Sequence, residues 1–160
     1  MYILKIFNLI SIVAISVYIG NYKSKMFGKR VIELKEFKNA LSFFKSKIEF
    51  TYEPIREIFW EISHIIYKDQ ENIFKSFCLI IGDKDTGIAW NEAVENSQNH
   101  LVYDDKQIIA MLGKTLGKTD KTGQISEIEI VTGFLDKQIL SIWQKLNLMN
   151  RIMSPKTWKK

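Results

Sequence analysis

The sequence predicts an all-α protein, an antiparallel helical bundle of about five or six helices behind an N-terminal transmembrane helix. Its 160 residues, of which 46% are hydrophobic and 26% charged, fit one globular domain rather than a disordered chain. Eight Gly and two Pro are too few for a β-rich chain with many tight turns. Apolar residues recur every three or four positions, and no alternating run predicts a strand.

An apolar segment opens the chain at residues 3–20 and is interrupted only by Lys5 and Asn8. Its 18 residues suffice to cross a hydrocarbon core of about 30 Å. A basic cluster follows directly, made of Lys23, Lys25, Lys29 and Arg30. By the positive-inside rule this cluster keeps the rest of the chain in the cytoplasm. A membrane anchor is therefore favoured over two alternatives, a cleaved signal peptide and a buried core helix.

These observations divide the chain into four parts. We predict a membrane anchor at residues 1–22, a basic juxtamembrane segment at 23–30, a cytoplasmic helical-bundle domain at 31–153 and a basic tail at 154–160. The predicted location is the cell membrane, with the bundle on its cytoplasmic side.

The formal charge is unevenly distributed. It is +5 over residues 1–30, −6 over 31–136 and +6 over 137–160. Basic ends around an acidic middle are typical of a domain whose two ends lie near an anionic membrane surface. A nucleic-acid-binding protein would instead carry its positive charge on a folded face, so no nucleic acid is expected as a partner.

The bundle is predicted to begin with a helix from Val31 to Ile48, because apolar residues recur there at steps of three and four. This helix ends before Pro54, a residue that suits the first turn of a helix. The second helix then runs to Ile66.

The next helices are predicted from their capping residues. Asp69 is expected to cap a third helix that ends at Gly82. Thr86 is expected to cap a short fourth helix, and Asp104 a fifth.

The last and longest helix is predicted from about Gly123 to beyond Met149. Its core positions follow a heptad rhythm in which Thr132 fills one gap. They are Ile125, Ile128, Leu135, Ile139, Ile142, Leu146, Met149 and Met153.

Two short motifs, Gly113-Lys114-Thr115 and Gly117-Lys118-Thr119, end like a phosphate-binding loop. The full motif needs a further Gly six positions before the Lys, where Ile108 and Leu112 stand instead. The sequence therefore predicts no nucleotide site.

The remaining reactive residues are interpreted as structural. His64 and His100 lack a neighbouring nucleophile, and Cys78 lies in an apolar run. Glu57 and Glu61 are one helical turn apart, which suits a solvated face as well as an acid–base pair. One Cys and two His exclude an internal disulfide and a four-ligand zinc site without carboxylates. No catalytic, metal or cofactor site is predicted, and the protein is not expected to be an enzyme.

One segment is more specific than the rest. Residues 112–120 read Leu-Gly-Lys-Thr-Leu-Gly-Lys-Thr-Asp and are followed by Gln124. Together with the order of the helices, this segment resembles the stage III sporulation protein AB family, over about residues 5–150. The family is similar in fold to the cytoplasmic domain of the type II secretion inner-membrane platform protein.

The resemblance implies a role in the channel, or feeding-tube, complex between mother cell and forespore, in the mother-cell membrane. It implies partnership with other stage III sporulation channel proteins, in particular the cytosolic ATPase stage III sporulation protein AA. It also implies a second, C-terminal membrane helix, which would begin where this sequence reaches Lys160.

We expect a partner-interaction surface on the segment that carries the resemblance, at Gly113, Gly117, Lys118, Asp120 and Gln124. The simpler interpretation is a tight turn between helices, with Asp120 as the cap of the last one. Two other functions remain open: a platform protein of a type II secretion or type IV pilus system, and a membrane-tethered enzyme. The enzyme would need a polar pocket with convergent acid and base groups.

Overall fold

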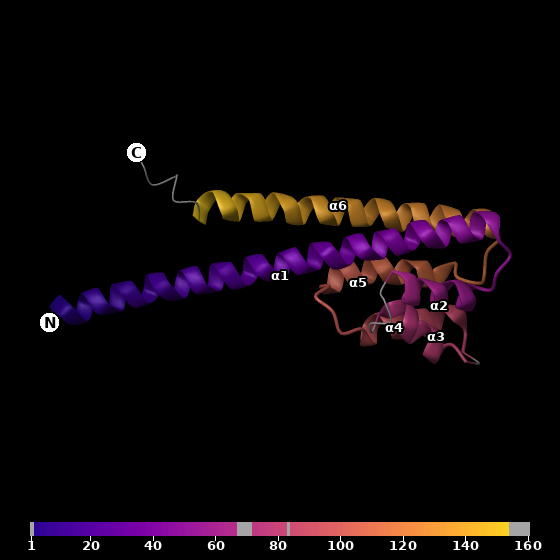
Figure 1. The fold of residues 1–160 in the computed structure, drawn as a ribbon, viewed down its shortest axis with the longest axis horizontal. Helices are drawn as coiled ribbons and strands as arrows, with labels where there is room; N and C mark the ends of the chain where they lie inside the picture. The colour runs from indigo at the N-terminus through magenta and orange to yellow at the C-terminus, as the bar shows by residue number, and fades with distance from the viewer. Residues whose placement is uncertain (1, 67–71, 83, 154–160) are drawn as a thin grey trace.

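Two long helices run antiparallel, and short helices pack against them at one end of the molecule (Figure 1). The computed structural model describes residues 2–66, 72–82 and 84–153. These residues contain no β-strand, so the predicted all-α class is confirmed. In chain order they form α1 (Tyr2–Phe50), α2 (Ile55–Ile65), α3 (Ile73–Ile80), α4 (Thr86–Asn96), α5 (Tyr103–Ala110), the 3₁₀ turn η1 (Met111–Lys114) and α6 (Lys121–Met153).

The first helix, α1, is unbroken over 49 residues. It joins the apolar segment, the basic segment and the first helix of the bundle, so the predicted boundaries at residues 22 and 30 are not helix ends. Gly20 and Gly28 lie inside it, and a helical Gly costs only about 1 kcal/mol, too little to interrupt so long a helix. No described residue before Arg30 is buried, Arg30 itself is largely covered, and the buried apolar stripe begins at Val31.

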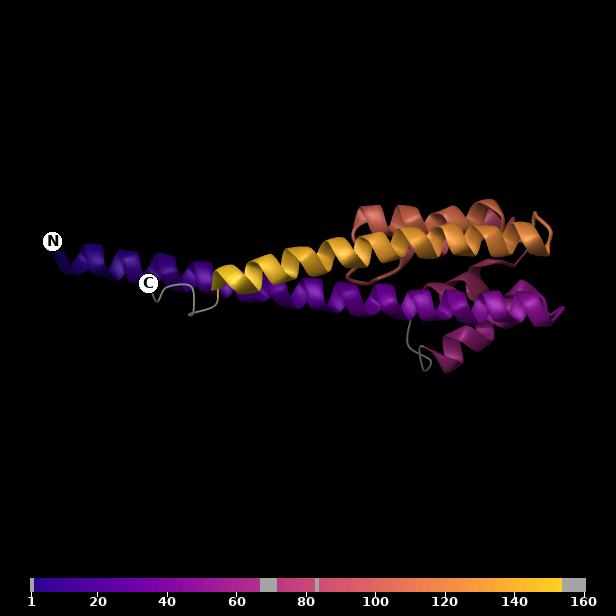
Figure 2. The ribbon, with the colours of Figure 1, turned by 90° about the horizontal axis from the view of Figure 1, so that it is seen from above.

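The last helix, α6, lies alongside the second half of α1 in the opposite direction (Figures 1 and 2). Two ion pairs connect the outer edges of the helices: Lys38 Nζ lies 2.5 Å from Asp136 Oδ1, and Lys45 Nζ lies 2.7 Å from Glu129 Oε1. Both pairs share one register, in which the numbers of residues at the same level add to 174.

The buried stripe of α6 follows the predicted heptads with one correction. Val131, not Thr132, fills the gap, because the apolar side chain takes the core position while Thr132 is half-exposed. Ile125 and Met149 are half-buried, and the side chain of Met153 lies outside the described set. The fully buried positions are Ile128, Val131, Leu135, Ile139, Ile142 and Leu146.

Three predicted caps differ from the observed ones. Asn72 caps α3, because its side-chain oxygen accepts a hydrogen bond from Lys75 N at 3.0 Å. Asp69, the predicted cap, lies outside the described residues, as does the predicted basic tail at 154–160. Asp85 rather than Thr86 caps α4, because its carboxylate reaches two free amides at the helix start. Asp104 does not cap α5, since the cap position is Val102, two residues earlier, and the helix begins at Tyr103.

An aromatic cluster forms the core where the short helices meet α1. Trp90 on α4 is fully buried, and its ring centroid lies 5.4–6.3 Å from those of four phenylalanines. Its indole Nε1 donates to the carbonyl of Ile109 at 2.9 Å, which satisfies the only polar atom of the side chain. The four are Phe37, Phe59, Phe74 and Phe77.

Candidate functional site

Four of the five residues of the predicted interaction surface lie in the segment between α5 and α6, and the fifth, Gln124, lies in the first turn of α6. Gly113 lies in η1 and is buried against the start of α4. A Cβ on Gly113 would lie 3.0 Å from Trp90 Cδ1 and 3.2 Å from the carbonyl oxygen of Gly87. The two glycines thus let two backbones touch, and Gly113 contributes packing rather than an exposed surface.

Gly87→Ala is expected to lower the free energy of unfolding by about 1–3 kcal/mol, since the added Cβ would collide with the carbonyl oxygen of Gly113. The matched control is Gly133→Ala in α6, where a Cβ meets no atom within 4 Å. That control should stabilise the protein by about 0.5–1 kcal/mol. Denaturant unfolding followed by far-UV circular dichroism gives both values, and equal effects of the two substitutions would contradict the close approach.

Gly117 ends the turn after η1 with a positive φ of 71°, a conformation that favours glycine. A Cβ there would lie 3.1 Å from the Thr86 hydroxyl oxygen at the start of α4. Leu112, inside η1, and Leu116, just before Gly117, are both buried. The two Leu-Gly pairs of the motif therefore fix this turn against α4.

The polar residues of the segment point outward and have local partners. Lys118 Nζ lies 3.0 Å from Asp85 Oδ1, and this ammonium, followed by the Ile88 amide, holds the pKa of Asp85 below its usual value. Asp120 Oδ1 accepts from Gly123 N at 2.9 Å, so Asp120 caps α6 as the simpler interpretation predicted. Gln124 Nε2 donates to the Thr119 carbonyl at 3.2 Å. The interaction surface itself stays a prediction. Of its five residues, only Gly113 is buried and cannot contribute to it directly.

A buried ion pair that the sequence did not indicate connects three helices. Arg30 of α1 forms a bidentate pair with Asp105 of α5: Nε donates to Oδ2 at 2.6 Å and Nη2 donates to Oδ1 at 2.8 Å. The side chains are 11% and 0% exposed. Gln138 of α6 donates to Asp105 Oδ1 at 3.2 Å, and Val102 N donates to Oδ2 at 3.1 Å. The sequence placed Arg30 in the juxtamembrane cluster and gave no signal for a partner 75 positions later.

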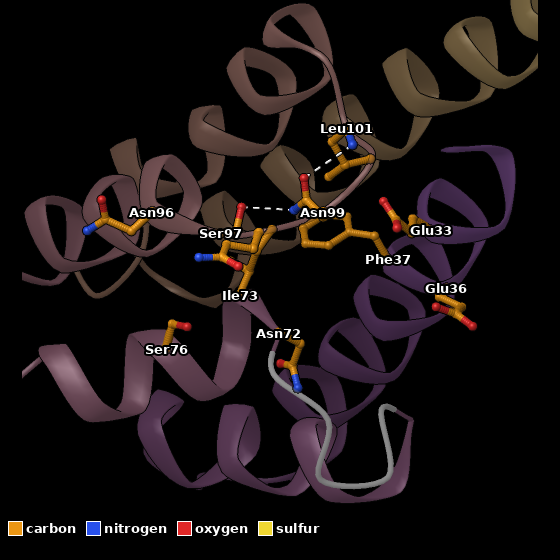
Figure 3. A pocket seen from close by; sticks show the side chains of 11 residues that line it. Glu33, Glu36, Phe37, Asn72, Ile73, Ser76, Asn96, Ser97, Asn99 and Leu101 are labelled. Atoms are coloured by element: carbon orange, nitrogen blue, oxygen red, sulfur yellow. Dashed lines mark hydrogen bonds between the residues drawn. The ribbon is translucent and has the colours of Figure 1, made fainter. Parts of the chain in front are cut away.

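A polar pocket of about 500 Å³ opens between α1, α3 and the connection from α4 to α5 (Figure 3). At its edge, Glu33 accepts from His100 N at 2.8 Å and contacts His100 Nδ1 at 2.5 Å, which fixes the connection to α1. The described lining residues include two carboxylates and two serine hydroxyls. They are Glu33, Glu36, Phe37, Asn72, Ile73, Ser76, Asn96, Ser97, Gln98, Asn99 and Leu101.

The other reactive residues are held in structural contacts. Burial raises the pKa of the Cys78 thiol to about 11, so it is a neutral thiol at pH 7. His64 Nδ1 lies 2.7 Å from the Trp60 carbonyl, and Glu61 lies 2.7 Å from Lys47 Nζ. Within residues 2–66, 72–82 and 84–153, no three His, Cys, Asp or Glu side chains are grouped to hold a metal ion.

The model of the stage III sporulation protein AB family matches residues 5–154. The chain belongs to this family. A solved structure of a stage III sporulation protein AB is similar to it with a TM-score of 0.65 at 17% sequence identity, covering 74% of this chain and 97% of the other. This likeness shows that the two share a fold. No curated protein matches the chain in sequence.

Proposed function

We propose that this sporulation protein AB family member is a non-enzymatic platform subunit of the channel complex between mother cell and forespore. The start of α1 lies in the mother-cell membrane, and the bundle lies in the cytoplasm. The observation that carries the proposal is the continuity of α1, which leads from an exposed apolar segment directly into the core of a family-typical bundle.

The membrane anchor is supported by exposure and by the placement of aromatic residues. Among the described helices, α1 alone is long and apolar enough to cross a membrane, and its apolar part is not buried by the rest of the chain. Exposed tyrosines flank this part, Tyr2 at one end and Tyr18 and Tyr22 at the other. Tyrosine is enriched at both membrane interfaces, and a helix from Tyr2 to Tyr22 is about 30 Å long.

A structural rather than catalytic role is supported by the partners of the reactive groups. His100 is bound to Glu33, Cys78 is buried, and Glu61 pairs with Lys47. In the polar pocket, the Glu33 carboxylate is already engaged by the backbone amide and the imidazole of His100, and this contact fixes the connection between α4 and α5 to α1, which supports a structural role for both side chains.

The proposed partner is the cytosolic ATPase stage III sporulation protein AA, bound where α6 begins. This end of the bundle lies farthest from the N-terminus of α1, so a cytosolic protein can reach it without meeting the membrane (Figure 1). Lys118, Asp120 and Lys121 are exposed there. Force applied at this end passes along α1, a continuous rod of 49 residues.

Lys118→Glu is expected to reduce capture of stage III sporulation protein AA by about tenfold in a pull-down with purified proteins, because it reverses a charge on the proposed surface. The melting temperature should change little, since the Lys118–Asp85 pair is exposed. The matched control is Lys114→Glu, one turn away and also exposed, which should capture normally.

Normal capture by the Lys118→Glu variant would contradict the proposed surface. If Lys118→Glu captures as well as the parent protein, while Asp120→Ala acts only by lowering the melting temperature through loss of the α6 cap, the surface is not at this segment.

A further inference from the structure

Residues at the same level of α1 and α6 carry opposite charges at one end of the helix pair and like charges at the other. At the end where α6 begins, opposite charges meet, Lys38 with Asp136 and Lys45 with Glu129. Continued toward the N-terminus of α1, the same register brings like charges to one level. Lys145 is level with Lys29, and Arg151 with Lys23.

The chain supplies no counter-charge within these two segments. Residues 1–32 and 137–160 contain no Asp or Glu. Arg30, the one cation of the cluster with an acidic partner, is held by Asp105. Of the other described basic side chains in these segments, all are exposed and none has an ion pair in the described structure. Five of them lie where the last turns of α6 run level with α1, and we name these five the collar: Lys23, Lys25, Lys29, Lys145 and Arg151.

The end of α6 in the collar is also poorly held by apolar packing. Leu146 is the last buried residue of the helix, and none of the described side chains after it is buried. Leu148 is 60% exposed, and Met26, at its level on α1, is 43% exposed. Figure 1 shows the two helices diverging toward this end. Like charges at one level and few buried side chains therefore leave this end of α6 weakly held by the described chain itself.

The collar lies where a bilayer around the start of α1 would place its headgroups. With about 1.5 Å per residue, Lys23 lies about 5 Å and Lys29 about 14 Å beyond the end of the apolar segment at Gly20. The headgroup layer is about 5–8 Å thick, and its surface potential extends about 8 Å further. The whole collar is therefore within reach of an anionic membrane surface.

We propose that the collar binds the phosphates of anionic phospholipids and thereby holds the last turns of α6 against the membrane. The inference rests on the membrane anchor proposed above and adds a second lipid contact, made by α6. Anionic headgroups suit this site because they present many phosphates in one plane, at the level where both helices carry their charges.

The test uses the full chain carrying Leu148→Cys, labelled there with an environment-sensitive fluorophore. Cys78 is buried and remains a neutral thiol, so labelling is selective for the new cysteine. The chain is reconstituted into nanodiscs of phosphatidylcholine, with or without about one third phosphatidylglycerol. A headgroup-spin-labelled lipid then reports the proximity of the fluorophore to the membrane surface by quenching.

Quenching is expected to be about fivefold stronger in the discs that contain phosphatidylglycerol. Arg151→Glu should remove most of this difference, and raised salt should weaken it. The control Lys114→Glu, which makes the same charge change on η1, should leave it intact.

The two proposals fail in different ways. If the chain floats with vesicles of both compositions but quenching is independent of phosphatidylglycerol or of Arg151, the anchor stands and the collar is overturned. An acidic protein would then be the remaining ligand. If the chain floats with neither kind of vesicle, the anchor fails and the collar with it.

Discussion

Asp105→Ala is expected to lower the free energy of unfolding by about 3–5 kcal/mol, because it leaves the Arg30 guanidinium buried without its counter-charge. The same substitution removes the acceptor for Gln138 and for the Val102 amide. The loss is measured by denaturant unfolding of the detergent-solubilised full chain, followed by far-UV circular dichroism.

The neighbouring carboxylate provides the matched control for this prediction. Asp104 is exposed at the start of the same helix, so Asp104→Ala should change the free energy of unfolding by less than about 0.5 kcal/mol. Replacing both charged partners, as in Arg30→Met with Asp105→Leu, should recover most of the lost stability, since no unpaired charge is left. A loss below about 1 kcal/mol for Asp105→Ala alone would show that the pair is solvated rather than buried.

Trp90→Ala is expected to destabilise the protein by about 3–5 kcal/mol, since it empties the centre of the aromatic cluster. Trp90→Phe separates two contributions, because it keeps an aromatic ring but removes the hydrogen bond to the Ile109 carbonyl. We expect a smaller loss for Phe, about 1–3 kcal/mol, from that unsatisfied carbonyl and the lost volume. Equal losses for Ala and Phe would mean that the hydrogen bond, and not the packing, dominates.

Much of the fold was predictable because helical spacing is a local property. The stripe from Val31 to Ile48 and the stripe from Ile128 to Leu146 can each be read from one segment alone. The predicted helix starts were less accurate, because two adjacent polar residues can both suit the cap position. Asp85 and Thr86 are both suitable cap residues, and only the observed backbone shows which side chain reaches the free amides.

The contacts that define the candidate site were predictable only in part. Asp120 as a cap follows from its place just before a helix, and the turn at Gly117 follows from glycine itself. The partner of Gly113 is Gly87, on another helix, and the partner of Arg30 is Asp105. Nothing in a single sequence links positions so far apart, because such contacts arise from packing and not from local preference.

The unbroken helix of α1 has a geometric consequence for the orientation of the bundle. Each residue between Gly20 and Val31 advances the helix by about 1.5 Å and turns it by about 100°. The number of residues in this stretch therefore sets the angle at which the bundle is rotated about the α1 axis relative to the apolar segment. One residue inserted directly after Gly20 would leave the contacts of Phe27 and Arg30 with the bundle unchanged and yet rotate the bundle about the α1 axis relative to the apolar segment.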